Sequence, residues 1–265
     1  MSESALLHTT RWPVALALAV VVSAGGLSAA IVSSNAAVSA PGSVEPGGTI
    51  EPGASSAPAV PHARRPEIRG VAVVVDGDTL EIGGQRIRLE GIDAPEAGQS
   101  CKGGFWGTWS CGKVATKALR RLVSGRETAC ENHGRDKYGR VLAICYAGGV
   151  EINAALVRDG HAWAFVKYST RYVAAEAEAR AARRGIFATE TETAWDYRAG
   201  RWAGAEQQAP DGCAIKGNIT RNGRIYHMPW SPWYAKVSIE ASRGERWFCS
   251  ETEAIAAGWR PAQGS

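Results

Sequence analysis

The chain has 265 residues, which is long enough for one or two domains with a sizeable hydrophobic core. Thirty Lys and Arg residues against 26 Asp and Glu residues give a formal net charge of +4. That balance suits an anionic partner but is too weak to establish one. Ten Trp and seven Tyr residues supply aromatic faces that can stack on bases or sugars, or simply pack in a core.

The N-terminal segment is expected to lie outside the fold. After Arg11, the stretch PVALALAVVVSAGGLSAAIV is uncharged and, at about 20 residues, long enough to span a bilayer. SNA at 34–36 resembles a cleavage site. Residues 1–36 are therefore read as a signal peptide, which is slightly favoured, or as a membrane anchor; a buried helix is the alternative. Either of the first two readings exports the rest of the chain, to be periplasmic, secreted or membrane-anchored.

Residues 37–67 are rich in Ala, Pro, Gly and Ser, which predicts a disordered linker. The first globular region, 68–190, opens with the β-branched run VAVVV at 71–75. TLEI and QRIRL then flank Gly83-Gly84, which is a signal for a two-residue hairpin.

An ideal hairpin of this kind places Thr79 opposite Arg88 and Ile82 opposite Gln85. Asp78 and Arg88 would then point to opposite faces of the sheet. A site that uses both side chains needs a bulge or a bend, for which Gly77 is the candidate.

Helical patterns follow the first strands. Residues 112–124 place apolar side chains on one side and basic side chains on another, a face that could contact nucleic acid or be solvated. RETACE and RVLAICY are typical of a strand pair, INAALVRDG of a short helix, and YVAAEAEARAARRG of a longer helix that ends at Gly185. Strands first, with helices interposed late, predict a small β-barrel with helices, an α+β fold.

The C-terminal part is expected to form a separate small module. Residues 191–212 show no clear periodicity and are read as a linker, and 213–262 as a Cys-bracketed module. The module resembles short domains appended to bacterial secreted or membrane-linked proteins, without a known activity. Its Trp residues could bind carbohydrate, cell wall or nucleic acid, or belong to the core, so its partner stays open.

Six cysteines fit an oxidising compartment. Metal ligation is the alternative, but the sequence has no CxxC, and Cys213, Cys249 and His227 are one ligand short of a closed zinc site. Proximity along the chain favours the disulfides Cys101–Cys111, Cys130–Cys145 and Cys213–Cys249.

Three separated motifs, DGDT at 76–79, RLEGIDAPE at 88–96 and DKYGR at 136–140, carry a resemblance to a known family. In this order and spacing they resemble the staphylococcal nuclease, or thermonuclease, family over roughly residues 70–190. The resemblance implies an OB-type five-stranded barrel with helices. It also implies calcium-dependent hydrolysis of phosphodiester bonds in DNA and RNA.

The resemblance assigns a role to each matching acidic residue. Asp78 and Asp93 would supply carboxylate ligands to Ca²⁺, with the backbone carbonyl of Ala94 and waters completing the shell. The family usually has Thr where Ala94 stands, a change that a backbone ligand survives. Glu96 would orient or deprotonate the attacking water.

The resemblance likewise implies the residues that bind substrate. Arg88 and Arg140 would hold the phosphate through their planar guanidinium groups. Lys137 and Tyr138 match positions that contact a terminal phosphate of the bound nucleotide.

Base contacts are expected at Tyr168, which matches a family tyrosine near the base. The companion tyrosine falls on Val166, so Phe165 or Trp163 would have to provide the second stacking face. This departure puts base preference in doubt rather than catalysis.

The favoured hypothesis is an exported, calcium-dependent nuclease that prefers single-stranded or flexible substrate. One alternative is a non-catalytic nucleic-acid-binding OB-type module with a surface-binding C-terminal domain. Another is a surface adhesin in which the barrel is a spacer. The acids and arginines of the matched motifs are all present, which favours the nuclease.

Overall fold

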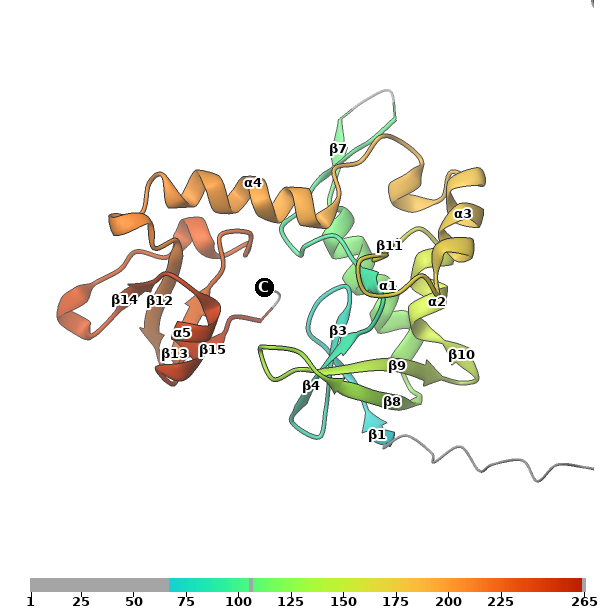
Figure 1. Ribbon diagram of the computed structural model, residues 1–265, viewed down its shortest axis with the longest axis horizontal. Coiled ribbons are helices and arrows are strands. Elements are labelled where there is room, and N and C mark those ends of the chain that lie inside the picture. The colour runs from blue at the N-terminus through green and yellow to red at the C-terminus, as the bar shows by residue number, and fades with distance from the viewer. Residues whose placement is uncertain (1–66, 105–106, 264–265) are drawn as a thin grey trace, which may run out of the picture. The chain divides into compact units, whose positions relative to one another are not determined.

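The computed structural model describes residues 67–104 and 107–263 (Figure 1). The expected signal peptide or anchor lies outside these residues, as does the expected linker except for Glu67. No helix within the described ranges is long and apolar enough to cross a membrane.

The first part of the structure is a curled sheet of OB type. Its strand order is β1-β8-β9-β4-β3-β2, with β10 paired to β9. β1 (Glu67–Val71) and β2 (Val73–Val74) are consecutive in the chain but pair at opposite ends of this order, with β8 and β3. The other strands are β3 (Thr79–Ile82), β4 (Gln85–Leu89), β8 (Glu127–Arg135), β9 (Val141–Ala147) and β10 (Val150–Glu151). Because one chain segment pairs at both ends, the seven-stranded sheet curls into a partly closed barrel of the expected OB type.

The first hairpin has the predicted register. Thr79 lies opposite Arg88 and Ile82 opposite Gln85. Both glycines of the Gly83-Gly84 turn have positive φ, 57° and 78°, as the tightest hairpin turns require. Alternation along β4 buries Ile87 and Leu89 and leaves Arg88 on the other face.

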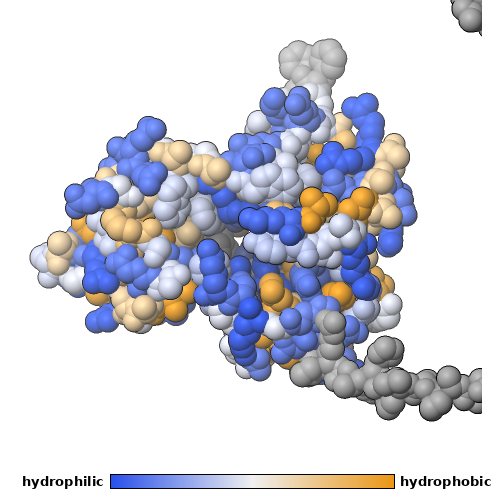
Figure 2. Space-filling view, viewed as in Figure 1, coloured by the Kyte–Doolittle hydropathy of each residue, from blue (hydrophilic) through white to orange (hydrophobic). Residues whose placement is uncertain are grey.

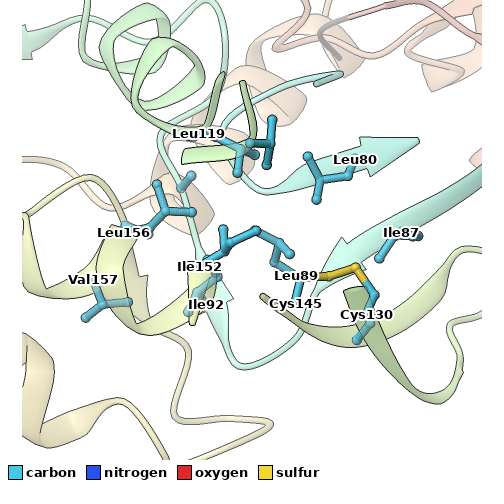
Figure 3. Packing of buried hydrophobic residues seen from close by; sticks show 14 of the residues in the cluster. Leu80, Ile87, Leu89, Ile92, Leu119, Cys130, Cys145, Ile152, Leu156 and Val157 are labelled. Atoms are coloured by element: carbon cyan, nitrogen blue, oxygen red, sulfur yellow. A yellow bond between two sulfur atoms is a disulfide. The ribbon is translucent and has the colours of Figure 1, made fainter. Parts of the chain in front are cut away.

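Three helices cover the barrel core: α1 (Cys111–Val123), α2 (Ile152–Arg158) and α3 (Val173–Ala181). In Figure 3 the strand residues Leu80, Ile87 and Leu89 gather with Leu119 of α1 and Leu156 of α2, all essentially inaccessible. Each such side chain stabilises the fold by about 1.5–3 kcal/mol.

Two short strand pairs lie outside the barrel sheet. β5 (Ile92–Asp93) pairs with β11 (Trp163–Ala164), which places Asp93 opposite Trp163. β6 (Cys101–Lys102) and β7 (Thr108–Trp109) pair within the loop before α1. A short 3₁₀ turn, η1 (Gly185–Phe187), follows α3.

The segment 191–212, expected as a linker, contains the 13-residue helix α4 (Ala194–Glu206). Thr193 caps its N-terminus by accepting a hydrogen bond from Asp196 N at 3.3 Å. Only Ala194 and Ala205 of the helix are buried, which explains why its sequence shows no apolar period.

The C-terminal part forms its own small sheet, ordered β14-β12-β13-β15. The elements are η2 (Pro210–Gly212), β12 (Ile215–Thr220), β13 (Gly223–His227), η3 (Tyr234–Lys236), η4 (Ala241–Arg243), β14 (Arg246–Phe248), α5 (Glu251–Ala256) and β15 (Arg260–Pro261). Tyr226, Phe248 and Trp259 form its core, so Trp259 is unavailable to a partner. Trp233 is 49% exposed.

The face shown in Figure 2 is mainly hydrophilic or neutral, with hydrophobic residues in small separate groups. Scattered exposed apolar side chains of this kind are normal for a folded protein and indicate no binding partner by themselves.

All six cysteines form disulfides, in the pairs that sequence proximity favoured: Cys101–Cys111, Cys130–Cys145 and Cys213–Cys249. Cys213 and Cys249 are therefore not metal ligands. His227 pairs instead through Nε2 with Asn218 Oδ1 at 3.0 Å.

The Cys130–Cys145 disulfide is expected to contribute strongly to stability. It joins directly opposed residues of β8 and β9 across a sequence separation of 15. A loop of this length predicts about 3 kcal/mol of stabilisation, so Cys130→Ala with Cys145→Ala should lower the free energy of unfolding by about that amount. Urea denaturation of both proteins measures it, with the reduced parent as control. Equal unfolding free energies would contradict the prediction.

Candidate active site

Asp78 lies in the bend of residues 76–78, just before β3 begins at Thr79. Strand alternation therefore does not fix its direction, and its carboxylate meets Arg88, with Oδ2 at 3.1 Å from Nη2. The same Oδ2 accepts a hydrogen bond from Ala94 N at 2.8 Å. Gly77 permits this close approach, since a Cβ there would lie 2.7 Å from that of Ala94.

Asp93 is the most enclosed acidic group of the site, with a side chain that is 0% exposed. It ends the two-residue strand β5, whose pairing with β11 fixes its direction. Its Oδ1 accepts a hydrogen bond from Arg88 Nη2 at 2.9 Å. One guanidinium nitrogen thus bridges Asp78 and Asp93.

Arg88 makes more contacts within the protein than an arginine that was free to bind phosphate would make. Its Nη1 donates to the carbonyl oxygens of Leu89 and Ile92, both at 3.0 Å. Its Nη2 contacts both aspartates. Arg88 therefore shapes the loop between β4 and β5 as well as neutralising the two buried carboxylates.

Glu96 is positioned by a buried glutamine that the sequence did not single out. Glu96 N donates to Gln99 Oε1 at 3.1 Å, and Gln99 N donates to Glu96 O at 2.7 Å. Gln99 Nε2 also donates to the carbonyl of Glu192 at 2.8 Å. Gln99 thus ties the Glu96 loop to the chain that enters α4.

Arg198 of α4 completes the site and was also missed by sequence reasoning. Its Nη2 donates to Asp93 Oδ2 at 2.7 Å and its Nη1 to Asp93 Oδ1 at 3.2 Å. Nη1 also donates to Glu96 Oε1 at 2.7 Å. Arg198 lies 105 residues from Asp93, and no motif or apolar period marks it.

Burial is the largest influence on the pKa values of two of the acidic groups, Glu96 and Asp78. It raises the pKa of Glu96 to about 8, although Arg198 acts to lower it. Burial also raises the pKa of Asp78, against the opposing effect of Arg88 and a smaller one of Arg140. The arginines therefore offset only part of the desolvation of these carboxyl groups.

Arg140 lies on the chain that leaves the β8–β9 turn. Its Nε donates to Asp136 Oδ2 at 2.7 Å, and its guanidinium lies 5.5 Å from the ring of Tyr138. Tyr138 raises the pKa of Lys137, with smaller contributions from Glu251 and Tyr168. The expected substrate residues Lys137, Tyr138 and Tyr168 thus lie within electrostatic reach of one another.

The two residues expected to provide a second stacking face, Trp163 and Phe165, have different surroundings. Trp163 is buried and cannot receive a base, because it packs in a cluster with Ile186 of η1 and Ala194 of α4. Phe165 is stacked on Trp195 of α4, with ring centroids 5.5 Å apart and planes at 9°. Tyr168 is 67% exposed and packs edge-on against Phe165, so it keeps a face for a ligand.

The donor set suits a hard divalent cation such as Ca²⁺, because Asp78 and Asp93 present carboxylate oxygens to one shared point, beside Ala94. Asp93 accepts three bonds from guanidinium groups, out of about four acceptor sites on a carboxylate. Among the described residues, no group of three or more His, Cys, Asp or Glu is arranged to hold a metal ion. A calcium ion would therefore need backbone and water oxygens beside the two aspartates.

Gly112 in α1 is required by the backbone of Glu96. A Cβ at Gly112 would lie 1.7 Å from the Glu96 carbonyl oxygen. Gly112→Ala should therefore lower the unfolding free energy by at least about 1–3 kcal/mol, as overpacking does. The helical control Gly200→Ala has open space at its Cβ and should gain up to about 1 kcal/mol. Thermal denaturation compares them, and equal effects would refute the close-packing argument.

The raised pKa of Glu96 predicts a pH dependence of stability. The folded carboxyl titrates near pH 8 and the unfolded one near 4.5, so folding takes up a proton between these values. Stability should then fall as pH rises through this window, and Glu96→Gln should reduce that fall. Carboxyl ¹³C shifts of labelled metal-free protein measure the pKa directly. A Glu96 signal that titrates below pH 5 would contradict the prediction.

Two family models match separate parts of the chain. A family model described as staphylococcal nuclease homologue matches residues 86–189, a range that holds Arg88, Asp93, Glu96 and Arg140 but begins after Asp78. A second model, described as ArfC, matches residues 195–261, which include all of α4 except Ala194. Arg198 therefore comes from the second range.

Several curated proteins are similar to the chain. The succinoglycan biosynthesis protein ExoI of Rhizobium meliloti (strain 1021) is 39% identical over 164 residues, 61% of this chain and 74% of ExoI. An uncharacterized endonuclease of Escherichia coli is 38% identical over 129 residues, 46% of this chain and 78% of that protein. The probable staphylococcal-like nuclease CAN2 of Oryza sativa subsp. japonica is 34% identical over 116 residues, 43% of this chain and 29% of CAN2.

Proposed function

Because the chain belongs to the staphylococcal nuclease homologue family, we propose that it is an exported, calcium-dependent nuclease acting on DNA and RNA. The observation that carries the proposal is the convergence of two buried aspartates on Arg88, with Glu96 held beside them through Arg198. Two of the relatives carry endonuclease or nuclease in their names, which supports a phosphodiester hydrolase.

In the proposed mechanism, Asp78, Asp93 and the carbonyl of Ala94 would hold a calcium ion. Such an ion would supply positive charge that polarises the phosphoryl group and offsets its charge. Glu96 accepts the proton of the attacking water, and its pKa of about 8 suits a base that works near neutral pH.

Arg140 and Arg88 bind the phosphate oxygens in this proposal. Burial acts to lower the pKa of Arg140, but Asp136, with smaller contributions from Asp78 and Glu251, raises it overall, so Arg140 remains charged. Arg88 first has to exchange part of its contact with Asp78 or Asp93 for the phosphate.

Lys137, Tyr138 and Tyr168 are proposed to contact the bound strand. The exposed ring of Tyr168 can stack on an unpaired base, which supports a preference for single-stranded or flexible nucleic acid.

Export is supported by the three disulfides, which persist in oxidising compartments. We propose that residues 1–36 direct it, as a signal peptide or membrane anchor, and that 37–67 tether a nuclease domain of 68–190. Residues 213–262 are proposed as an accessory module whose partner is open.

The pairing of Arg198 with Asp93 and Glu96 favours one alternative, a nucleic-acid-binding module without catalysis. In that case the arginine would permanently fill the acidic site. The cleavage experiment separates the two functions.

Glu96→Gln should lower the rate of single-stranded DNA cleavage by about 100- to 10,000-fold, because it removes the base. DNA binding should be retained, since Gln keeps the size and a hydrogen-bonding group. The full chain, purified from an oxidising compartment, is assayed with calcium and with a chelator. Glu178→Gln, an exposed change on α3, is the control and should cleave at the parent rate.

Calcium-independent cleavage would remove the metal from the proposal. Parental turnover in Glu96→Gln would remove the base. DNA binding by the parent without cleavage would leave the binding module as the function.

A further inference from the structure

Arg198 contacts the acidic groups of the site but lies outside the range matched by the nuclease family. Among the described residues, it is the one basic residue that does so. It lies in the range matched by the second family. Its guanidinium spans both oxygens of Asp93 and one oxygen of Glu96. The same carboxylates are those that the proposed function assigns to the cation and the attacking water.

Helix α4 positions Arg198, and the first residues of the helix are held by packing. Ala194 is fully buried in a cluster with Trp163 and Ile186, and Trp195 stacks on Phe165. Arg198 stands four residues after Ala194, so both lie on the same side of the helix. Gln99 adds a hydrogen bond to Glu192 just before the helix.

The ion pair is shielded from water. The side chain of Asp93 is 0% exposed, that of Glu96 13% and that of Arg198 24%. A two-pronged guanidinium–carboxylate contact at this depth is much less screened than a surface pair. Arg198 therefore supplies part of the positive charge that faces the buried carboxylate of Asp93.

A divalent cation needs the same oxygens. Arg198 occupies both oxygens of Asp93, and its positive charge repels any ion that approaches them. Space for its withdrawal exists, because Arg198 also lines a pocket of about 390 Å³ together with Tyr138, Trp202 and Glu251. The same pocket is lined by the Glu251 carboxylate, a negative charge on the side to which the guanidinium would withdraw.

We propose that Arg198 is a tethered competitor of the divalent cation: it pairs with Asp93 and Glu96 in the metal-free protein and gives up Asp93 when a cation binds. The inference rests on the proposed calcium site. It makes the cation affinity of the nuclease part depend on a residue of the adjoining helix.

The test measures calcium binding without nucleic acid. Isothermal titration calorimetry on the full-length protein compares the parent with Arg198→Gln and Arg198→Lys. Arg198→Gln should bind calcium at least about tenfold more tightly, and Arg198→Lys should stay within about threefold of the parent, since Lys keeps the charge. The matched control is Arg201→Gln, on the same helix, where the arginine donates to the carbonyl of Pro229 and not to the acids.

The proposal is supported if Arg198→Gln binds calcium more tightly than the parent while Arg198→Lys and Arg201→Gln do not. It is also supported if calcium binding appears only in Arg198→Gln. Equal or weaker binding by a folded Arg198→Gln overturns it and makes Arg198 a supporting residue of the site. If neither protein binds calcium and the parent does not cleave DNA, the calcium-dependent function fails together with this inference. Binding and cleavage by the parent with unchanged affinity in the variant overturn the inference alone.

A second measurement, made on the parent, tests the proposal even if Arg198→Gln does not fold. In the parent, the Arg198 side-chain NMR signals, assigned through Arg198→Lys, should show restricted rotation without calcium and free rotation with it. Signals that calcium leaves unchanged would overturn the proposal.

Discussion

The buried carboxylate of Asp93 is the constraint on which the rest of the site depends. A charge without solvent contact is costly unless it is paired and hydrogen-bonded. The structure pairs it twice, through Arg88 from the barrel and Arg198 from α4. Each arginine then engages a further acid, Asp78 or Glu96, so one buried charge organises four others.

Close packing makes that organisation possible. Gly77 lets the bend before β3 approach Ala94, and Gly112 lets α1 start against the Glu96 carbonyl. Gln99, itself buried, joins the Glu96 loop to the chain before α4. Helix, loop and barrel therefore share one set of backbone contacts, and displacement of any of them would shift the acids.

Local patterns predicted much of the fold. The glycine pair predicted the register of the β3–β4 hairpin, and the first two motifs marked Asp78, Arg88 and Asp93, which meet in space. Disulfide partners followed from proximity along the chain. In each case neighbouring residues carry the information.

Long-range contacts were beyond such patterns. Arg198 belongs to a helix whose exposed surface gives no apolar period, and its partners lie about a hundred residues earlier, so nothing local points to it. The burial of Trp163 also depends on α4, which covers it only in the folded chain. The sequence likewise left undecided how Asp78 and Arg88 meet, which depends on a bend that precedes the strand.

The Cys130–Cys145 bond across β8 and β9 makes the stability of the barrel depend on the redox state of its surroundings. The bond cross-links the two paired strands that frame the Arg140 turn, and it persists only where thiols are oxidised. A chain in a reducing compartment lacks this cross-link, so a smaller fraction of it is folded there than under oxidising conditions. The redox state of the surroundings would thus set how much of the chain is folded around its acidic site.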